Sequence, residues 1–399
     1  MTPFSRRFLL GAGAAGLAGA TLMPTLTLAA APTDKRFVVI VLRGGMDGLS
    51  AVVPHGDPAY ASARGRIAIA APGTGEGAAL KLDGMFGLHP NLEALKALYD
   101  GGDAAIFHAV ASPYRERSHF DGQDVLENGD TQPRRRHDGW LNRALAGYGR
   151  KDANRALAVS QAMPLILTGP EAVSSWTPPQ LPQGDDDYLA RVQRMYEDDA
   201  QLRTALEDAL ATREMAMGAM DGNMRGGGNQ LAALARPAGA LLRAEDGARF
   251  AVMDPGGWDT HNNQGAAQGL LAGRLADLDR GLAALKDSLG TVWKDTMVVV
   301  VTEFGRTVAV NGSNGTDHGT ASAAFLLGGA VKGGQMIADW PGLGQGQLYE
   351  NRDLKPTMDM RALFKTALVA HMGLDEGFVS REVFTDGERI ALLEQVLRG

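Results

Sequence analysis

The sequence contains no cysteine among its 399 residues. Disulfide bonds and thiolate chemistry are therefore excluded, and any bound metal must be held by nitrogen and oxygen ligands. Aromatic residues make up only 6% of the chain and charged residues 21%, against 45% hydrophobic residues. The chain is thus too apolar for a disordered protein and too poor in charge for a coiled coil. This composition indicates a globular protein with a large core.

Positive charge is also in short supply. Lys and Arg number 39 against 46 Asp and Glu, which gives a formal net charge of -7. Because nucleic-acid binding relies on clustered Lys and Arg, we expect no nucleic-acid partner. Glycine is abundant, with 52 residues, and it favours tight turns and loops in which the backbone comes close to a ligand.

Residues 1–31 have the pattern of a twin-arginine signal peptide. The adjacent Arg6 and Arg7 precede a Gly- and Ala-rich apolar run, and Ala29–Ala31 offer a small-residue cleavage site. The apolar run is shorter than the roughly 20 residues that span a membrane, and Gly and Pro interrupt it. We therefore expect export by the twin-arginine translocase to the periplasm or the medium, with no permanent membrane span.

Apolar runs alternate with helical patterns over residues 32–399. Continuous runs rich in β-branched residues predict strands that are buried on both faces, as in a parallel sheet. Such runs lie at residues 37–42, 104–110, 164–168, 250–253, 297–302 and 323–327, and helical patterns lie at residues 91–99, 188–220, 268–289, 360–372 and 389–397. The alternation predicts one α/β domain with a doubly wound, mostly parallel sheet and helices on both faces. Residues 170–230 form a candidate helical insertion.

Candidate metal ligands lie beside the predicted strands. In open α/β sheets, ligands bind beyond the carboxyl ends of the strands. Carboxylates and imidazoles follow three of the predicted strands or directly precede the last one: Asp47, Asp259, His261, Glu303, Asp317 and His318. We expect these side chains to meet at one edge of the sheet and to bind one or two divalent ions, such as Zn, Mn, Mg or Ca.

Two of these motifs have alternative interpretations. Asp317 and His318 could both bind a metal, or Asp317 could orient His318 from behind. Glu303 follows a strand too apolar to be exposed, so its carboxylate must be metal-bound or paired, for instance with Arg306.

The segment Arg115–Phe120 carries the candidate nucleophile. Ser118 is expected at the start of a helix, either as its N-cap or as a nucleophile that a metal or base activates. Arg115 and Arg117 could hold phosphate or sulfate oxygens near the helix N-terminus, and His119 adds an imidazole.

Five motifs together resemble the exported family named domain of unknown function 1501, over nearly all of the chain after the signal. More loosely, they resemble the alkaline phosphatase/sulfatase superfamily. The motifs are Leu42–Gly48, Arg117–Phe120, Trp258–His261, Thr302–Thr307 and Asp317–Gly319.

The superfamily resemblance implies a set of roles. Asp47 matches the metal-binding Asp that ends the first strand, and Ser118 matches the nucleophile. Asp259 and His261 match an Asp/His metal pair, Glu303 stands where the superfamily has a strand-end Asp-His, and Asp317–His318 falls near its last His. Phe304 replaces the expected His, so that one metal ion, two metal ions or a site without catalysis all stay open.

Two functions follow as expectations. In the first, the protein is an exported metal-dependent hydrolase of phosphate or sulfate esters, in which Ser118 attacks and Arg115, Arg117 or Arg306 binds the non-bridging oxygens. In the second, it is a non-catalytic exported protein of the same fold that binds an anionic glycan or an envelope partner.

Overall fold

The computed structural model describes residues 33–149, 155–160, 162–177 and 231–398, together with a few positions between 195 and 210. The expected signal peptide and most of the candidate insertion at 170–230 lie outside these residues. None of the helices in this described part of the chain is both long and apolar enough to cross a bilayer.

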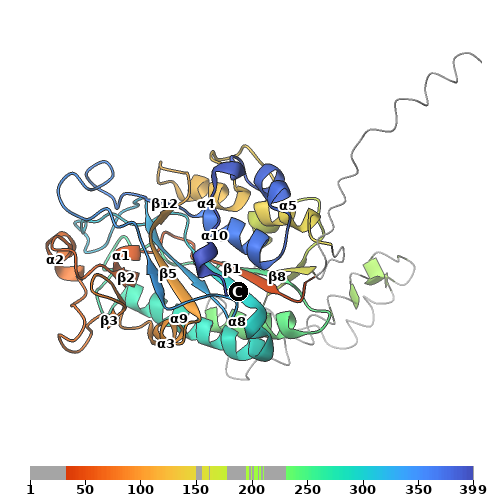
Figure 1. Cartoon of the computed structure of the whole chain (residues 1–399), viewed down its shortest axis with the longest axis horizontal. Coiled ribbons are helices and arrows are strands. Elements are labelled where there is room, and N and C mark those ends of the chain that lie inside the picture. The colour runs from red at the N-terminus through yellow and green to blue at the C-terminus, as the bar shows by residue number, and fades with distance from the viewer. Residues whose placement is uncertain are drawn as a thin grey trace, which may run out of the picture.

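A nine-stranded sheet forms the centre of the molecule (Figure 1). Strand β10 is antiparallel to both of its neighbours, and every other pairing in this sheet is parallel. This confirms the predicted mostly parallel sheet. In spatial order, the strands are β11 (Gln335–Ile337), β5 (Ala104–Ala111), β10 (Ser322–Leu327), β9 (Thr296–Val301), β1 (Arg36–Val41), β8 (Phe250–Met253), β6 (Ala156–Val159) and β7 (Ser174–Trp176), and β12 (Met358–Asp359) pairs with β5.

Both faces of the sheet are covered by helices, as the alternating pattern predicts (Figure 1). Successive side chains of β1 point to opposite faces: Val38 and Ile40 join one core cluster, and Phe37 and Val39 join the other. The first face packs against α3 (Glu93–Asp100), α8 (Leu231–Arg243) and α9 (Leu270–Leu289). The second packs against α4 (His119–Asn128), α5 (Trp140–Ala146), α10 (Arg361–Thr366) and α11 (Glu376–Phe378).

Short elements after β1 close one end of the sheet (left in Figure 1). Gly48 allows the close approach there, because a Cβ at this position would lie 2.4 Å from the backbone nitrogen of Ala323 in β10. These elements are α1 (Gly48–Ala51), α2 (Tyr60–Arg64) and a three-stranded sheet of β2 (Val52–Val53), β4 (Gly87–Leu88) and β3 (Leu80–Lys81).

Two predicted elements are wrong. The run at 164–168 is a 3-10 turn, Leu165–Leu167, in which the backbone nitrogen of Ile166 donates to Glu127 Oε2 instead of to a strand. The predicted helix at 389–397 is not formed: its first residue ends the 3-10 turn Gly387–Arg389, and a second 3-10 turn covers Glu394–Val396. The backbone of that segment bonds instead with residues 330–332.

Candidate metal centre

The topology brings separate segments of the chain to one edge of the sheet. The carboxyl ends of β5, β9, β1 and β8 share this edge, and the amino end of the reversed strand β10 lies there as well. His119 begins the helix after β5, Glu303 follows β9, and Asp259 and His261 lie in the loop after β8. His318 lies just before β10. The sequence prediction of a metal site depended on these segments meeting at one edge of the sheet.

Three imidazoles and one carboxylate converge at this edge. Nε2 of His261 lies 2.9 Å from Nε2 of His318 and 3.0 Å from Oδ1 of Asp259. Nε2 of His318 is 3.4 Å from the same oxygen, and Nε2 of His119 is 3.5 Å from Oδ2 of Asp259. Ligands at about 2.0–2.1 Å from a tetrahedral ion lie about 3.3 Å from one another. These separations therefore match the spacing of ligands around one ion.

Each of the three imidazoles is held from behind through its Nδ1. The acceptor is Glu303 Oε1 for His119 at 2.8 Å and Asp317 Oδ1 for His261 at 3.2 Å. For His318 it is the backbone oxygen of Arg117 at 2.9 Å. Because these oxygens only accept, each Nδ1 is the donor in its hydrogen bond, and in the neutral form of each ring the lone pair then lies on Nε2. Such outer partners orient the histidine ligands of metal sites. Glu303 and Asp317 thus lie behind the imidazoles, in the orienting role that was open for Asp317.

Glu303 has no exposed surface, yet it remains charged. Burial favours the neutral acid, but donors from His119, Gln123 and the backbone of Gly44 outweigh it and lower the pKa of Glu303. The same hydrogen bond to Glu303 raises the pKa of His119. Burial, reinforced by the charge of His119, lowers the pKa of His318.

The residues fit a divalent metal ion. Nε2 of His119 is buried and has no hydrogen-bond partner among the described residues, which is the state of a ligand atom that faces an ion. Atoms of His119, Asp259 and His318 that could bind a metal all lie within 4.8 Å of one another. Three imidazole nitrogens and a carboxylate oxygen are a donor set that suits zinc and related transition metals better than Mg or Ca.

Arg306 holds the loops of the centre together. It is buried, and its guanidinium donates to the backbone oxygens of Gly45, Gly44, Trp258 and Thr316 as well as to Asp259 Oδ1. Burial would raise the pKa of Asp259, but Arg306 lowers it. With its donors engaged in this way, Arg306 fixes Asp259. Arg306 therefore does not pair with Glu303, which was one of the alternatives for that carboxylate. Its donors bond with the protein, so the predicted clamp on substrate oxygens is not formed in this arrangement.

Ser118 lies at the edge of this cluster, directly before α4. It occupies the N-cap position as predicted, but its side chain makes no capping hydrogen bond. Its backbone nitrogen donates to the hydroxyl of Tyr114, and the preceding Arg117 adopts a left-handed φ of 63°. Non-glycine residues hold such angles only when their surroundings impose them, and they gather at functional sites. Ser118 thus directly precedes the metal-ligand candidate His119, on a backbone segment that these contacts fix.

The two arginines before Ser118 point to other partners. Arg117 forms ion pairs with the buried Asp353, at 2.7 Å, and with the exposed Glu350. Arg115 donates to the backbone oxygens of Ser112 and Tyr114. Neither guanidinium bonds with the converging imidazoles. In this arrangement, Arg115 and Arg117 therefore do not point their donors at an ester bound there, as the sequence had predicted.

Asp47 is kept apart from the cluster by a buried arginine. Its carboxylate forms an ion pair with Arg64 and accepts from Ser50 Oγ at 2.9 Å and Gln264 Nε2 at 2.6 Å. Asp47 and Arg64 both have 0% exposure. The guanidinium supplies the positive charge that a metal ion was expected to supply, and Asp47 does not belong to the group of His119, Asp259 and His318 whose atoms lie close enough to share an ion.

Three residues that support the site escaped sequence reasoning. Gln123 lies four residues after His119, on the same helical face, and this spacing could have identified it as a second donor to Glu303. Gln264 accepts from the hydroxyls of Thr260 and Thr316 and so joins the two histidine loops. No sequence signal marks Gln264 or Arg64.

Solved structures resemble the chain only distantly. The lipoteichoic acid synthase LtaP of Listeria monocytogenes is 12% identical, with a TM-score of 0.40 and coverage of 90% of this chain and 77% of its own. The phosphonate monoester hydrolase of Agrobacterium radiobacter is 13% identical, with a TM-score of 0.38 and coverage of 86% and 74%. The alkaline phosphatase of the Antarctic bacterium TAB5 is 12% identical, with a TM-score of 0.33 and coverage of 75% and 92%. Likeness at this level carries no argument about activity, so the chemistry rests on this chain's own residues.

The family comparison is more decisive. No curated protein matches the chain. The family described as "Protein of unknown function (DUF1501)" matches residues 105–384, which include His119, Asp259, His261, Glu303 and His318. The chain therefore belongs to this family.

Proposed function

We propose that the protein is an exported, metal-dependent hydrolase of phosphate or sulfate esters. The observation that carries the proposal is the convergence of the Nε2 atoms of His119, His261 and His318 on the carboxylate of Asp259, with Ser118 directly before His119 in the chain. Residues 1–31 would direct the chain to the twin-arginine translocase, and it would act in the periplasm or the medium on a small anionic ester or glycan.

The ion would be held by His119, His261, His318 and Asp259. A divalent ion supplies charge neutralisation of the ester oxygens and lowers the pKa of a hydroxyl or water. One site of this kind is what the geometry supports, since Arg64 already neutralises Asp47.

The surrounding residues hold this constellation in place. Glu303 and Asp317 fix the rings of His119 and His261, and the backbone oxygen of Arg117 fixes His318. Arg306 orients Asp259 and at the same time ties the loops at 44–45, 258 and 316 together. Such preorganisation lets the site stabilise developing charge without rearranging.

Ser118 is the proposed nucleophile. Its Oγ would form a bond to phosphorus or sulfur as the bond to the departing alcohol breaks, and a water would then cleave the serine ester. The strained Arg117 and the bond from the Ser118 nitrogen to Tyr114 fix the backbone that presents this hydroxyl.

A panel of aryl phosphomonoesters, phosphodiesters and sulfate esters tests this proposal. Ser118→Ala should abolish turnover of the preferred ester and leave the metal content intact. The matched control Ser62→Ala, at an exposed serine of α2, should keep full turnover. Unchanged turnover in Ser118→Ala would remove Ser118 from the mechanism.

A second candidate is a non-catalytic exported protein that binds an anionic glycan or an envelope partner. It is favoured by the engagement of Arg117 with Asp353 and of Arg306 with backbone oxygens and Asp259, which keeps these two guanidinium groups from binding the ester that is cleaved. Absence of turnover on every ester of the panel, with and without added Zn, Mn, Mg or Ca, would favour this candidate.

A further inference from the structure

A cavity lies between the end of β5 and the segment around β12. Its volume is about 150 Å³, and residues 111–113, Arg115 and residues 356–359 line it. None of the converging metal-ligand candidates contributes to this lining. An engineered cavity of this volume holds a molecule of the size of benzene, so a phosphate or sulfate group has room here.

Arg115 brings an unpaired positive charge to the cavity. Only its Nη1 is engaged, with the backbone oxygens of Ser112 and Tyr114, and no carboxylate of the described residues forms an ion pair with it. Burial lowers the pKa of Arg115, and the opposing influence of Tyr349 and Asp359, neither of which forms an ion pair with it, is smaller. Its Nε and Nη2 are therefore available donors, in the fork geometry that matches phosphate and sulfate.

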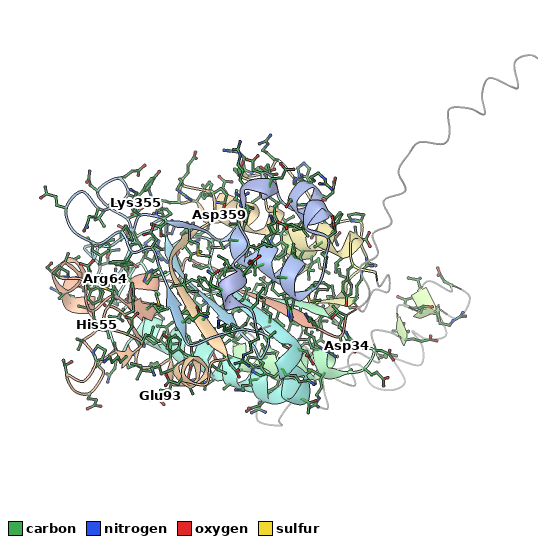
Figure 2. The ribbon with its side chains drawn as sticks, viewed as in Figure 1. Asp34, His55, Arg64, Glu93, Lys355 and Asp359 are labelled. Atoms are coloured by element: carbon green, nitrogen blue, oxygen red, sulfur yellow. The ribbon has the colours of Figure 1, made fainter. Side chains whose placement is uncertain are left out.

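The carboxylate in the lining is already neutralised. Asp359 accepts from Arg361 Nη2 at 2.7 Å, from Arg361 Nε at 3.1 Å and from the backbone nitrogen of Arg361 at 2.9 Å. With this pair cancelled, Arg115 leaves the cavity positive. The exposed Lys355 directly precedes the lining segment, and Figure 2 labels both Lys355 and Asp359 in the upper left part of the picture. The hydroxyls of Ser112 and Thr357 add polar groups to the lining.

We propose that this cavity binds a second phosphate or sulfate group of the substrate, beside the ester that is cleaved at Ser118. The assignment to a substrate group rests on the proposed function, whereas the anion site itself rests on Arg115 and the cavity. Arg115 lies three residues before Ser118, so their Cα atoms are at most about 11 Å apart. Arg115 thus has a role different from the one expected at the sequence level: it selects substrates that carry more than one anionic group.

The binding arm of the test uses inorganic sulfate and titration calorimetry on the purified protein. Arg115→Ala should weaken sulfate binding at least tenfold, as expected for loss of a charged hydrogen bond. Thr357→Val should weaken it less, and the exposed Arg66→Ala should bind as the wild type does. His318→Ala, at the metal centre, should retain the binding that depends on Arg115.

Equal affinity in the wild type, Arg115→Ala and Thr357→Val would overturn the anion site. Should Arg115→Ala fail to fold, Arg115→Lys and Thr357→Val decide the question. Arg115→Lys keeps the charge but lacks the fork, so it should bind more weakly than the wild type.

The activity arm compares aryl esters that carry one or two phosphate or sulfate groups. We expect a lower KM for the doubly charged ester, and Arg115→Ala should shrink the ratio of the two KM values. Equal KM values for the two esters in the wild type would overturn the substrate assignment. Sulfate binding that depends on Arg115 without turnover of any ester would refute the proposed function alone. Turnover with sulfate binding that is independent of Arg115 would refute the cavity proposal alone.

Discussion

Nδ1 of His119 lies 2.8 Å from Oε1 of Glu303, a carboxylate with no exposed surface. This pair joins the start of α4 to the end of β9, two elements that are 184 residues apart in the chain. It fixes the ring of His119 so that Nε2 points toward Asp259. The same oxygen of Glu303 also accepts from the backbone nitrogen of Gly44, so a third loop is tied to the pair.

Glu303→Gln should weaken metal binding without removing a ligand. Gly44, Gln123 and His119 all donate to the one oxygen Oε1, and a neutral amide oxygen in its place accepts more weakly than a carboxylate, so the His119 ring loses part of its support. We expect a loss of about 10–100-fold in metal affinity, measured by competition with a chelator. Glu93→Gln, at an exposed position of α3, is the control and should bind as the wild type does. Equal affinity in Glu303→Gln and the wild type would show that Glu303 does not orient a ligand.

The Asp47–Arg64 pair should matter for stability and not for metal content. Arg64→Met leaves a carboxylate buried without its cation, which costs about 3–5 kcal/mol of unfolding free energy. The double variant Asp47→Asn/Arg64→Met removes both charges and should recover part of that loss. Denaturant unfolding measures both effects. Loss of the metal from a folded Asp47→Asn protein would instead restore Asp47 as a ligand.

Two buried histidines should make the fold sensitive to mild acid. Burial lowers the pKa of His108 and of His371 to about 4 each, from an ordinary 6.5. Between these pKa values the unfolded chain binds protons at both histidines and the folded chain does not. The free energy of unfolding should therefore be highest above about pH 7 and fall as the pH drops from 6.5 toward 4. Each histidine contributes up to about 3 kcal/mol to this loss.

Urea unfolding at a series of pH values measures the slope. His371→Gln can still donate to the backbone oxygen of Arg36, which His371 Nε2 contacts at 2.9 Å, but it cannot titrate. We expect it to lose about half as much stability as the wild type over this pH range. An identical slope in the variant and the wild type would exclude His371 as a source.

Sequence reasoning placed the edge of the sheet and its histidine loops correctly, because buried strands leave a clear apolar signal. The runs at 37–42, 250–253 and 297–302 correspond to β1, β8 and β9, and parallel pairing then determines that the residues after them meet. The run at 164–168 misled because four or five apolar residues can also pack as a buried turn. The strand β6 was missed, since Ala156–Val159 contains two alanines and only one β-branched residue, which gives a weak strand signal.

The sequence does not predict which partner each charged side chain contacts. Asp47 follows β1 as a ligand would, but its partner Arg64 comes from the short helix α2, which carries no motif. Arg117 and Arg306 lie beside the site in sequence, yet Asp353 in one case and four backbone oxygens in the other engage their guanidinium groups. These choices depend on tertiary contacts between distant segments, which no local pattern encodes.

Elemental analysis of the folded protein tests the metal centre most directly. The wild type should retain close to one divalent transition-metal ion per chain, and His261→Ala and His318→Ala should each lose it while remaining folded. Ser118→Ala should keep it. The metal centre would be contradicted if the wild type held no stoichiometric metal even after incubation with Zn or Mn. It would also be contradicted if folded His261→Ala and His318→Ala variants held as much metal as the wild type.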